Sequence, residues 1–324
     1  MIMDLNIQSL TKKEIISSII PNEPDDVFIC CSSPEERCKG AILRFNNYKA
    51  KKVFLIRYNG CNEKKKQNII EMKNLLKNFG DIVEIKIHEQ NPIPILMDLI
   101  KKIEVTCSFS SQRKITIDVS TMIKWHILIL LKYLELKNLL KNVRILYTEP
   151  QDYETNLFNP LSFGIKKIFP IPLFSGEHDF SNESMLIIML GYEGNRALAL
   201  LEKKDPNKCL LLIAKPPYHK EWEGRTEEMN KAIINLVGES NIRYIDSRNP
   251  MIVANQLREL LSDPNISAYN HYISPLGTKP QTIGLYLYLS TKPQNTILIY
   301  GSPLRHNELF YSHGIGDTWI LPIH

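Results

Sequence analysis

The sequence alternates short apolar runs with longer segments of helical periodicity, and this alternation constrains the fold more than any single motif. In the first half, runs with strand composition lie at 26–31, 52–57, 82–87, 114–118 and 143–147. Apolar residues at helical spacing separate them, as between Gln67 and Phe79. Strands that alternate with helices predict a parallel sheet with helices on both faces. Since the runs lack strict polar alternation, each strand should be buried on both sides.

The same order of strands and helices recurs in the second half of the chain. Strand-like runs lie at 185–190, 209–213, 242–245, 269–274 and 296–300. Between the two series, residues 151–180 are rich in Pro, Phe, Asn and Ser, which is typical of a connector.

Local similarities in matching order support a duplication. They pair Glu89–Ile95 with Asp246–Val253, Asp118–Lys124 with Ser274–Lys279, Arg144–Pro150 with Ile297–Pro303, and Arg37 with Arg196, which follow the first strand of each half. Self-similarity in a fixed order indicates an internal repeat. We therefore predict an α/β protein of two tandem Rossmann-like three-layer units with mainly parallel sheets. The predicted boundaries are 1–150 for the first unit, 151–180 for the connector and 181–324 for the second unit with a C-terminal tail.

Composition agrees with a globular chain of this kind. The 324 residues suffice for about two domains of roughly 150 residues each. A hydrophobic content of 44% allows large cores, and a net charge of +5 permits an anionic ligand without indicating nucleic-acid binding. We see no signal-peptide pattern and no uncharged apolar stretch long enough to span a membrane. The six cysteines show no CxxC pair, so we expect reduced thiols and a cytoplasmic protein, with Cys30 and Cys31 in the core.

Ligands of open parallel sheets bind at the carboxyl ends of the strands, so the loops there are the candidate site. These loops lie at 32–37, 58–61, 120–124, 191–196, 215–218, 247–249 and 274–279. Hydroxyls, arginines and lysines in such loops suit phosphates and a base. The predicted ligand-binding residues are Ser32, Ser33, Arg37, Ser120, Thr121, Lys124, Gly191, Glu193, Arg196, Ser274, Gly277, Thr278 and Lys279.

The segment Gly277-Thr-Lys279 is the most suggestive of these loops. Glycine lets backbone N–H groups approach an anion, while a hydroxyl and an ammonium at a helix N-terminus add direct contacts. The alternative interpretation is a turn that binds nothing. Neither GxGxxG nor GxxxxGK[ST] occurs, so a dinucleotide cofactor and P-loop hydrolysis are not supported. We predict no metal and no cofactor.

A hydroxyl at the end of the fourth strand followed by Gly-Thr-Lys at a helix start resembles the CARF domains of CRISPR-associated proteins. The residues that carry the resemblance are Ser274, Gly277, Thr278 and Lys279, with Glu193 and Arg196 in the first loop. The first half matches by topology alone, because 120–124 lacks the glycine. The resemblance implies binding of cyclic oligoadenylates, a pair of units that mimics a CARF dimer, and a role in antiviral defence. It also implies that Lys279, Ser274 and Thr278 could support slow, metal-independent cleavage of the ligand.

Two further features have structural and functional interpretations. In the tail Arg305–Trp319, the side chains of His306, Glu308, His313 and Asp317 could line a site or bind a metal. We favour the alternative of a final hairpin that packs Trp319 and Ile320 on the core. His126, in an apolar helix, is expected to be buried and hydrogen-bonded rather than catalytic.

Three functions are compatible with the sequence. The first is a nucleotide-binding sensor or regulatory subunit that acts with a protein partner or by self-association. The second is an enzyme that modifies a nucleotide or a nucleic-acid end. The third is a structural subunit that offers only protein-binding surfaces. Fold class alone does not decide among them.

Overall fold

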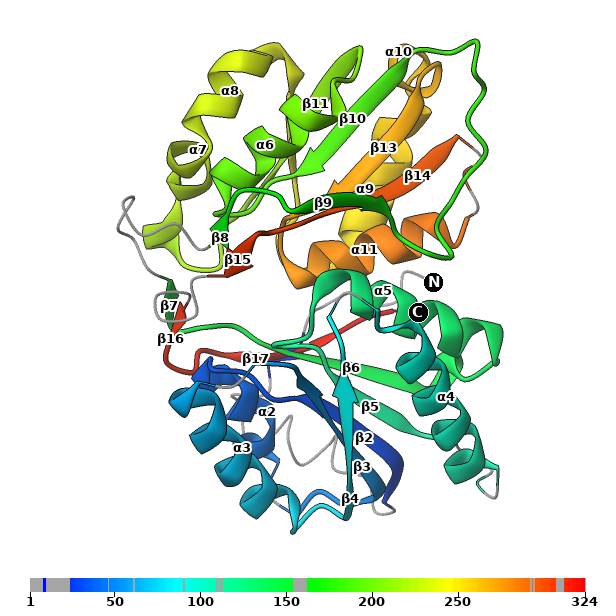
Figure 1. Cartoon of the computed structure of the whole chain (residues 1–324), viewed down its shortest axis with the longest axis vertical. Coiled ribbons are helices and arrows are strands. Elements are labelled where there is room, and N and C mark those ends of the chain that lie inside the picture. The colour runs from blue at the N-terminus through cyan, green and yellow to red at the C-terminus, as the bar shows by residue number, and fades with distance from the viewer. Residues whose placement is uncertain are drawn as a thin grey trace. The chain divides into compact units, whose positions relative to one another are not determined.

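The computed structural model describes residues 8–9, 24–45, 47–60, 62–89, 91–108, 110, 113–153, 162–291, 293, 295–306 and 312–323. The chain divides into two compact units, Met1–Tyr153 with Tyr311–His324, and Glu154–Phe310. Each unit contains a mainly parallel sheet between two layers of helices, which confirms the predicted fold class (Figure 1). The sequence also predicts a short amphipathic helix from Leu10 to Ile20, and this segment lies outside the described residues.

The first unit is built on a seven-stranded sheet in the order β1-β17-β6-β5-β2-β3-β4. The strands are β1 (Gln8–Ser9), β2 (Asp25–Cys31), β3 (Ala50–Tyr58), β4 (Asp81–Ile87), β5 (Ile115–Asp118), β6 (Val143–Thr148) and β17 (Thr318–Leu321). β2 to β6 are parallel to one another, whereas β17 runs antiparallel to both β6 and β1.

Two helix pairs cover the faces of this sheet (Figure 1). One side carries η1 (Glu36–Lys39), α2 (Gly40–Arg44) and α3 (Glu63–Leu76), and the other carries α4 (Ile93–Cys107) and α5 (Lys124–Leu136), which η2 (Leu140–Asn142) follows. The α2 side holds an aromatic cluster in which the Phe28 ring lies 5.5 Å from Tyr48 and 5.3 Å from Phe79. The inner strands β2, β5 and β6 are nearly continuous in buried residues, as expected for a sheet covered on both faces, whereas the edge strand β4 is largely accessible.

The second unit is built on a six-stranded sheet in the order β12-β11-β10-β13-β14-β9. The strands are β9 (Lys167–Pro170), β10 (Ser184–Met189), β11 (Lys208–Ala214), β12 (Ile242–Ile245), β13 (Asn270–Pro275) and β14 (Thr296–Ser302). One face carries α6 (Gly194–Lys204), α7 (Arg225–Met229) and α8 (Lys231–Val237), and the other carries α9 (Pro250–Ser262) and α11 (Lys279–Leu289). Short helices η3 (Lys220–Trp222), η4 (Glu239–Asn241) and α10 (Pro264–Ser267) complete the unit.

Both units share one topology, which confirms the internal repeat. The parallel strands follow the order third, second, first, fourth, fifth, and an antiparallel strand lies beside the fifth. The register also agrees, because Ile29 pairs with Ile117 in the first unit as Ile187 pairs with Ile273 in the second. Asp118 therefore corresponds to Ser274, one residue further along each fourth strand.

The antiparallel strand of each sheet comes from the chain that leaves the other unit. After β6, the chain forms β7 (Asp152–Tyr153) and β8 (Ser162–Phe163) before β9 joins the second sheet. After β14, it forms β15 (Arg305–His306) and β16 (Ser312–His313) before β17 joins the first sheet. β7 pairs with β16, and β8 pairs with β15. The repeat thus includes a reciprocal exchange of the sixth strand.

The exchange shows that the predicted C-terminal hairpin is wrong. β15, β16 and β17 each pair with a strand from elsewhere in the chain. Pairing with β6 explains the burial in the tail, because the Thr318 hydroxyl lies 2.7 Å from that of Thr148 and Leu321 is 3% exposed. Ile320 does pack against the core beside α2, as expected.

The burial of the cysteines agrees with the sequence-based expectation. Cys30, Cys31, Cys38 and Cys107 are buried free thiols, which confirms that Cys30 and Cys31 face the core. Burial raises the pKa of Cys38 to about 12 and that of Cys107 to about 11.

Within the described part of the chain, every helix is too short or too polar to cross a bilayer.

Candidate functional site

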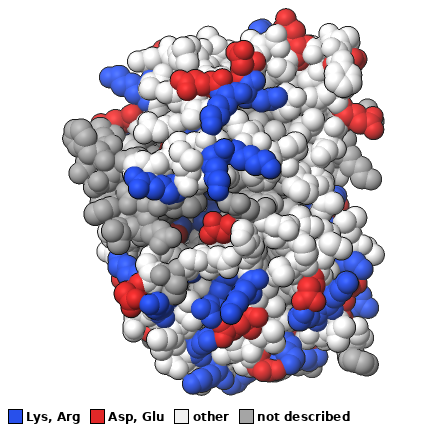
Figure 2. Space-filling model, viewed as in Figure 1, with Lys and Arg blue, Asp and Glu red and all other residues white. Residues whose placement is uncertain are grey.

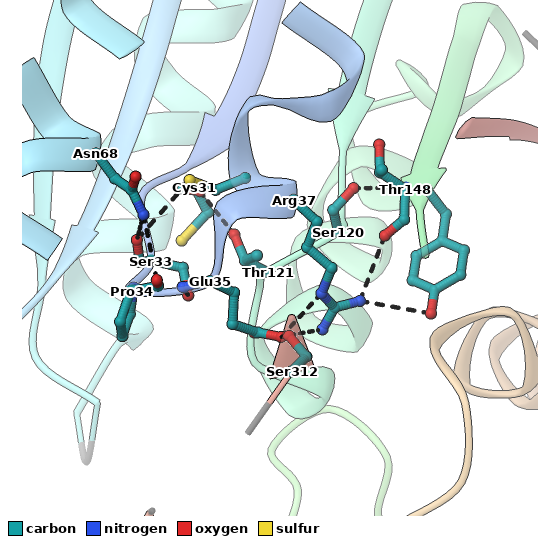
Figure 3. Close-up of polar contacts among 12 residues, drawn as sticks. Cys31, Ser33, Pro34, Glu35, Arg37, Asn68, Ser120, Thr121, Thr148 and Ser312 are labelled. Atoms are coloured by element: carbon teal, nitrogen blue, oxygen red, sulfur yellow. Dashed lines mark hydrogen bonds and ion pairs between the residues drawn. The ribbon is translucent and has the colours of Figure 1, made fainter. Parts of the chain in front are cut away.

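The loop after β2 is held in place by a buried arginine (Figure 3). Arg37 is 1% exposed, and its Nε and Nη2 lie 2.9 and 2.8 Å from Oε2 of Glu35. Its Nη1 donates to the Thr148 carbonyl at 3.3 Å and lies 3.5 Å from the Tyr147 hydroxyl. The Ser312 hydroxyl donates to the same Glu35 carboxylate at 2.5 Å. Arg37 therefore ties the first loop to the end of the fifth parallel strand.

The second unit repeats this arrangement. Arg196 is 2% exposed, and its Nη1 lies 2.7 Å from Oε2 of Glu193. Its Nε donates to the Gly301 carbonyl at 2.8 Å, and its guanidinium lies 4.7 Å from the centre of the Tyr300 ring. In each unit the arginine thus binds a glutamate of its own loop. It also donates to the carbonyl of the residue that directly follows a tyrosine of the fifth parallel strand. We call these two groups the arginine latches, centred on Arg37 and Arg196.

The predicted hydroxyls of the first unit make internal hydrogen bonds. Ser32 donates to Ile56 O at 3.3 Å, and the Ser33 hydroxyl accepts from the Glu35 amide at 3.2 Å. The Ser120 hydroxyl bonds to Asp118 and accepts from the Thr148 amide at 2.7 Å.

A further hydroxyl bond lies where the strand order reverses. Thr121 donates to Cys31 O at 2.7 Å, which joins the loops after β5 and β2 (Figure 3). This is the crevice where an open sheet would hold a ligand. Lys124, the first residue of α5, is half-buried at the same edge. The first unit therefore presents its predicted residues mainly as supports for its own loops.

In the second unit, the Gly277-Thr-Lys279 segment forms a helix cap. Thr278 caps α11 in a capping box with Gln281, whose side chain accepts from the Thr278 amide at 2.9 Å. The Thr278 hydroxyl donates to Ser247 O at 2.8 Å. A Cβ on Gly277 would lie 2.1 Å from the Gln281 side-chain oxygen, so the cap itself explains the glycine.

The neighbouring predicted residues differ in accessibility. Ser274 is completely buried. A Cβ on Gly191 would lie 2.5 Å from Leu276 O, so the loops after β10 and β13 are in close backbone contact. Lys279, at the first turn of α11, is half-buried and is the cation of this loop with partial access to solvent.

A second group of side chains at these strand ends was not predicted. The Arg225 guanidinium lies 5.8 Å from the Tyr192 ring centre and 5.6 Å from that of Trp222. The Arg248 guanidinium lies 5.1 Å from the Tyr218 ring centre. One set comprises Tyr192 after β10, Trp222 of η3 and Arg225 at the start of α7, and the other comprises Tyr218 and Arg248 after β11 and β12. We refer to the two sets together as the basic–aromatic cluster.

Hydrogen bonds connect the basic–aromatic cluster to the cap of α11. The Ser247 carbonyl accepts from the Tyr218 hydroxyl at 3.2 Å and from the Thr278 hydroxyl at 2.8 Å. Arg248 donates to Pro217 O at 3.1 Å and also to Tyr218 O. These bonds join the loops after β11, β12 and β13 of the second unit, and Lys279 directly follows the bonded Thr278 in the sequence.

A sequence signal for this cluster was present. Residues 218–225 interleave aromatic and basic side chains, a composition typical of surfaces that stack bases and contact phosphates. Our prediction ended this loop at residue 218 and therefore missed Trp222 and Arg225. Tyr192 and Arg248 lay in predicted loops but were not chosen, because they belong to no short motif.

Other charged groups are dispersed. Figure 2 shows lysines and arginines interspersed with acidic and uncharged residues on the face in view, with no single field of one sign. Within the described residues, no group of three or more His, Cys, Asp or Glu side chains could hold a metal ion.

His126 is buried and hydrogen-bonded, as predicted. Its Nε2 lies 3.3 Å from the Glu89 carbonyl, which can only accept, so Nε2 carries the proton. Its Nδ1 therefore accepts from the Tyr58 hydroxyl at 3.1 Å, and that oxygen accepts from the Ile123 amide at 3.2 Å. Burial lowers the pKa of His126 to about 3.

The neutral His126 should make the first unit sensitive to acid. On unfolding, the pKa of His126 rises from about 3 to about 6.5. Between pH 6.5 and 3 the unfolded chain therefore binds a proton that the folded chain does not. The free energy of unfolding falls as the pH drops below 6.5. At pH 4.5 the loss should be about 2–3 kcal/mol. Urea unfolding of wild type and His126→Gln at pH 7.5 and 4.5 measures it. The variant should lose less stability between the two pH values, whereas His88→Gln, at an exposed position, should behave as wild type. Equal losses in all three proteins would show that His126 does not carry the effect.

Comparisons with known proteins give little beyond these geometric findings. No protein-family model and no curated protein matches the chain. Several solved structures show distant similarity, and three of them illustrate its extent. A protein of unknown function from Pseudomonas aeruginosa PAO1 is 9% identical with a TM-score of 0.26, covering 86% of this chain and 93% of its own. The cytoplasmic domain of a prokaryotic cation chloride cotransporter is 10% identical with a TM-score of 0.26. The similarity covers 89% of this chain and 99% of that domain. A putative universal stress protein from Pseudomonas aeruginosa UCBPP-PA14 is 10% identical with a TM-score of 0.26. The similarity covers 86% of this chain and 94% of that protein. At these values the similarities support no statement about function.

Proposed function

We propose that the second unit binds a nucleotide-like anion over the basic–aromatic cluster, and that the protein is a nucleotide sensor or regulatory subunit. The observation that carries this proposal is the position of Arg225 and Arg248, with their aromatic neighbours, at the carboxyl ends of parallel strands. Ligands of this fold class bind at that edge. Guanidinium groups contact phosphate oxygens, and aromatic faces stack bases.

Lys279 supports the same assignment. It lies in the first turn of α11, a helix of 11 residues, where the helix dipole and the ammonium both favour an anion. The resemblance of Gly277-Thr-Lys279 to CARF domains adds cyclic oligonucleotides to the candidate ligands. It is also the reason to propose a protein partner and a role in antiviral defence.

The first unit is the weaker candidate for the ligand. Its loop hydroxyls are occupied by internal bonds, and Thr121 bridges the crevice at the reversal of strand order. It also carries the carboxylate of Asp118 where the second unit has Ser274. A buried carboxylate at this position disfavours a second anion. We therefore propose one ligand per chain.

Binding is better supported than catalysis. Ser274 is completely buried, and the Thr278 hydroxyl is engaged with Ser247 and Gln281. Neither hydroxyl is placed to act on a ligand over the cluster. Of the three residues that the resemblance implied for cleavage, only Lys279 combines a charged side chain with partial access to solvent.

Isothermal titration with ATP, cyclic tetra-adenylate and cyclic hexa-adenylate tests the proposal. We expect one of these to bind with a stoichiometry near one. Arg225→Ala and Lys279→Ala should each weaken binding at least about tenfold, since a charge-assisted hydrogen bond contributes about 1.5–3 kcal/mol. Arg258→Ala, at an exposed position of α9, is the matched control and should bind as wild type. Absence of binding, or variants that bind unchanged, would leave a structural subunit as the better description. Ligand breakdown during long incubation would favour an enzyme.

A further inference from the structure

A second surface of the second unit lies along β12, the outermost strand of its sheet. β12 pairs with β11 alone among the described strands. The Ile245 carbonyl accepts from the Lys215 amide at 2.8 Å, so residue 245 points its backbone groups toward β11. Backbone direction alternates along a strand, hence Ile242 and Tyr244 point theirs outward. The Arg243 guanidinium donates to the outward Ile242 carbonyl at 2.7 Å, which agrees with this assignment.

A groove of about 620 Å³ runs beside this edge. Apolar side chains from α8 and β12 line it, namely Ile234, Ile242 and Tyr244. Tyr244 is 52% exposed, a high value for a large aromatic side chain. An unpaired sheet edge next to exposed apolar surface is a feature that soluble proteins normally cover or use for binding.

The charges around the groove are mainly acidic. Glu227, Glu228 and Glu239 line it together with one cation, Lys231. No ion pair within the described part of the chain involves these three carboxylates. A ligand with several positive charges would supply the counter-charges that the groove lacks.

We propose that this groove and the β12 edge bind an extended basic segment of a partner protein, which adds to the sheet as a further strand. Strand addition uses the outward backbone groups of Ile242 and Tyr244 for affinity, and the added strand would replace or share the bond of Arg243 to the Ile242 carbonyl. Lysines or arginines at every second position would turn toward the groove. Their aliphatic stems would lie on Ile242 and Tyr244, and their charged ends would reach the carboxylates. This inference does not depend on nucleotide binding at the basic–aromatic cluster.

Fluorescence anisotropy of the full-length protein with a labelled octapeptide of alternating lysine and valine tests the proposal. We expect saturable binding that weakens as salt increases, and no binding of the matched glutamate–valine peptide. The triple variant Glu227→Lys, Glu228→Lys, Glu239→Lys should weaken binding by roughly tenfold or more. Tyr244→Pro should also weaken it, because proline removes the outward N–H. Glu259→Lys, at an exposed position of α9, should leave binding unchanged.

Three outcomes would overturn the proposal. The first is absence of saturable binding of the lysine–valine peptide to wild type. The second is equal binding by wild type and the triple variant, provided that circular dichroism shows both to be folded. The third is sedimentation that shows concentration-dependent self-association which Tyr244→Pro abolishes, because a second copy of the chain would then occupy the edge.

Discussion

Deleting residues 312–324 is expected to unfold the first unit while the second unit stays folded. The deletion removes β17, which lies between β1 and β6 in the sheet. It therefore uncovers the edge of β6, whose residues are almost all buried. It also removes Leu321 and Ile323, which are 3% and 6% exposed. Each such side chain contributes about 1.5–3 kcal/mol, so with the lost strand pairing the deletion should cost about 5 kcal/mol or more. That is comparable with the whole stability of a typical domain.

Hydrogen exchange with mass spectrometry measures this prediction directly. Amides of β2 and β5 should lose protection in the truncated chain, whereas those of β10 and β13 should keep it. His313→Ala, at an exposed position in the same tail, is the control and should match wild type. Retention of protection in β2 and β5 would show that β17 contributes little to the first unit.

Replacing Arg196 by methionine should destabilise the second unit by about 3–5 kcal/mol. The substitution keeps a long side chain but leaves the Glu193 carboxylate buried opposite an uncharged group, since the Glu193 side chain is only 5% exposed. It also removes the hydrogen bond to the Gly301 carbonyl. Breaking one side of a buried ion pair costs more than the pair contributes, because the remaining charge stays desolvated.

A double variant separates the charge from the packing. Arg196→Met combined with Glu193→Gln should recover a large part of the loss, as measured by urea unfolding of both variants. Arg37→Met is the matched comparison in the first latch, and its cost should be smaller. The Glu35 side chain is 13% exposed and already accepts from Ser312, so it can be partly resolvated. Equal costs at both latches, or no recovery in the double variant, would contradict this account.

The secondary structure followed closely from local sequence patterns. The parallel strands of both sheets were predicted within a few residues, because a buried parallel strand needs a continuous apolar run and its neighbouring helix needs apolar residues at helical spacing. The matched segments around Tyr147 and Tyr300 also revealed the repeat. In the structure both tyrosines lie beside a latch arginine.

The roles of the predicted site residues could not be read from the sequence in the same way. An arginine after a strand can face a ligand or a carboxylate, and Arg37 and Arg196 face carboxylates. Gly277-Thr278 suited a phosphate loop, yet Gln281 three residues after Thr278 is also the signature of a capping box, which the structure contains. Residue type constrains the chemistry that is possible, and the neighbours in space select among the possibilities.

The sequence alone determined that the chain forms two α/β units of one design, because apolar periodicity is a local property that each segment carries by itself. Only the tertiary structure decided that each sheet is completed by a strand from the chain leaving the other unit. It also decided that Arg225 lies beside Tyr192 and Trp222, and Arg248 beside Tyr218. A four-residue strand such as β17 has too few side chains to specify its partner locally, so its pairing depends on which buried edge is left open.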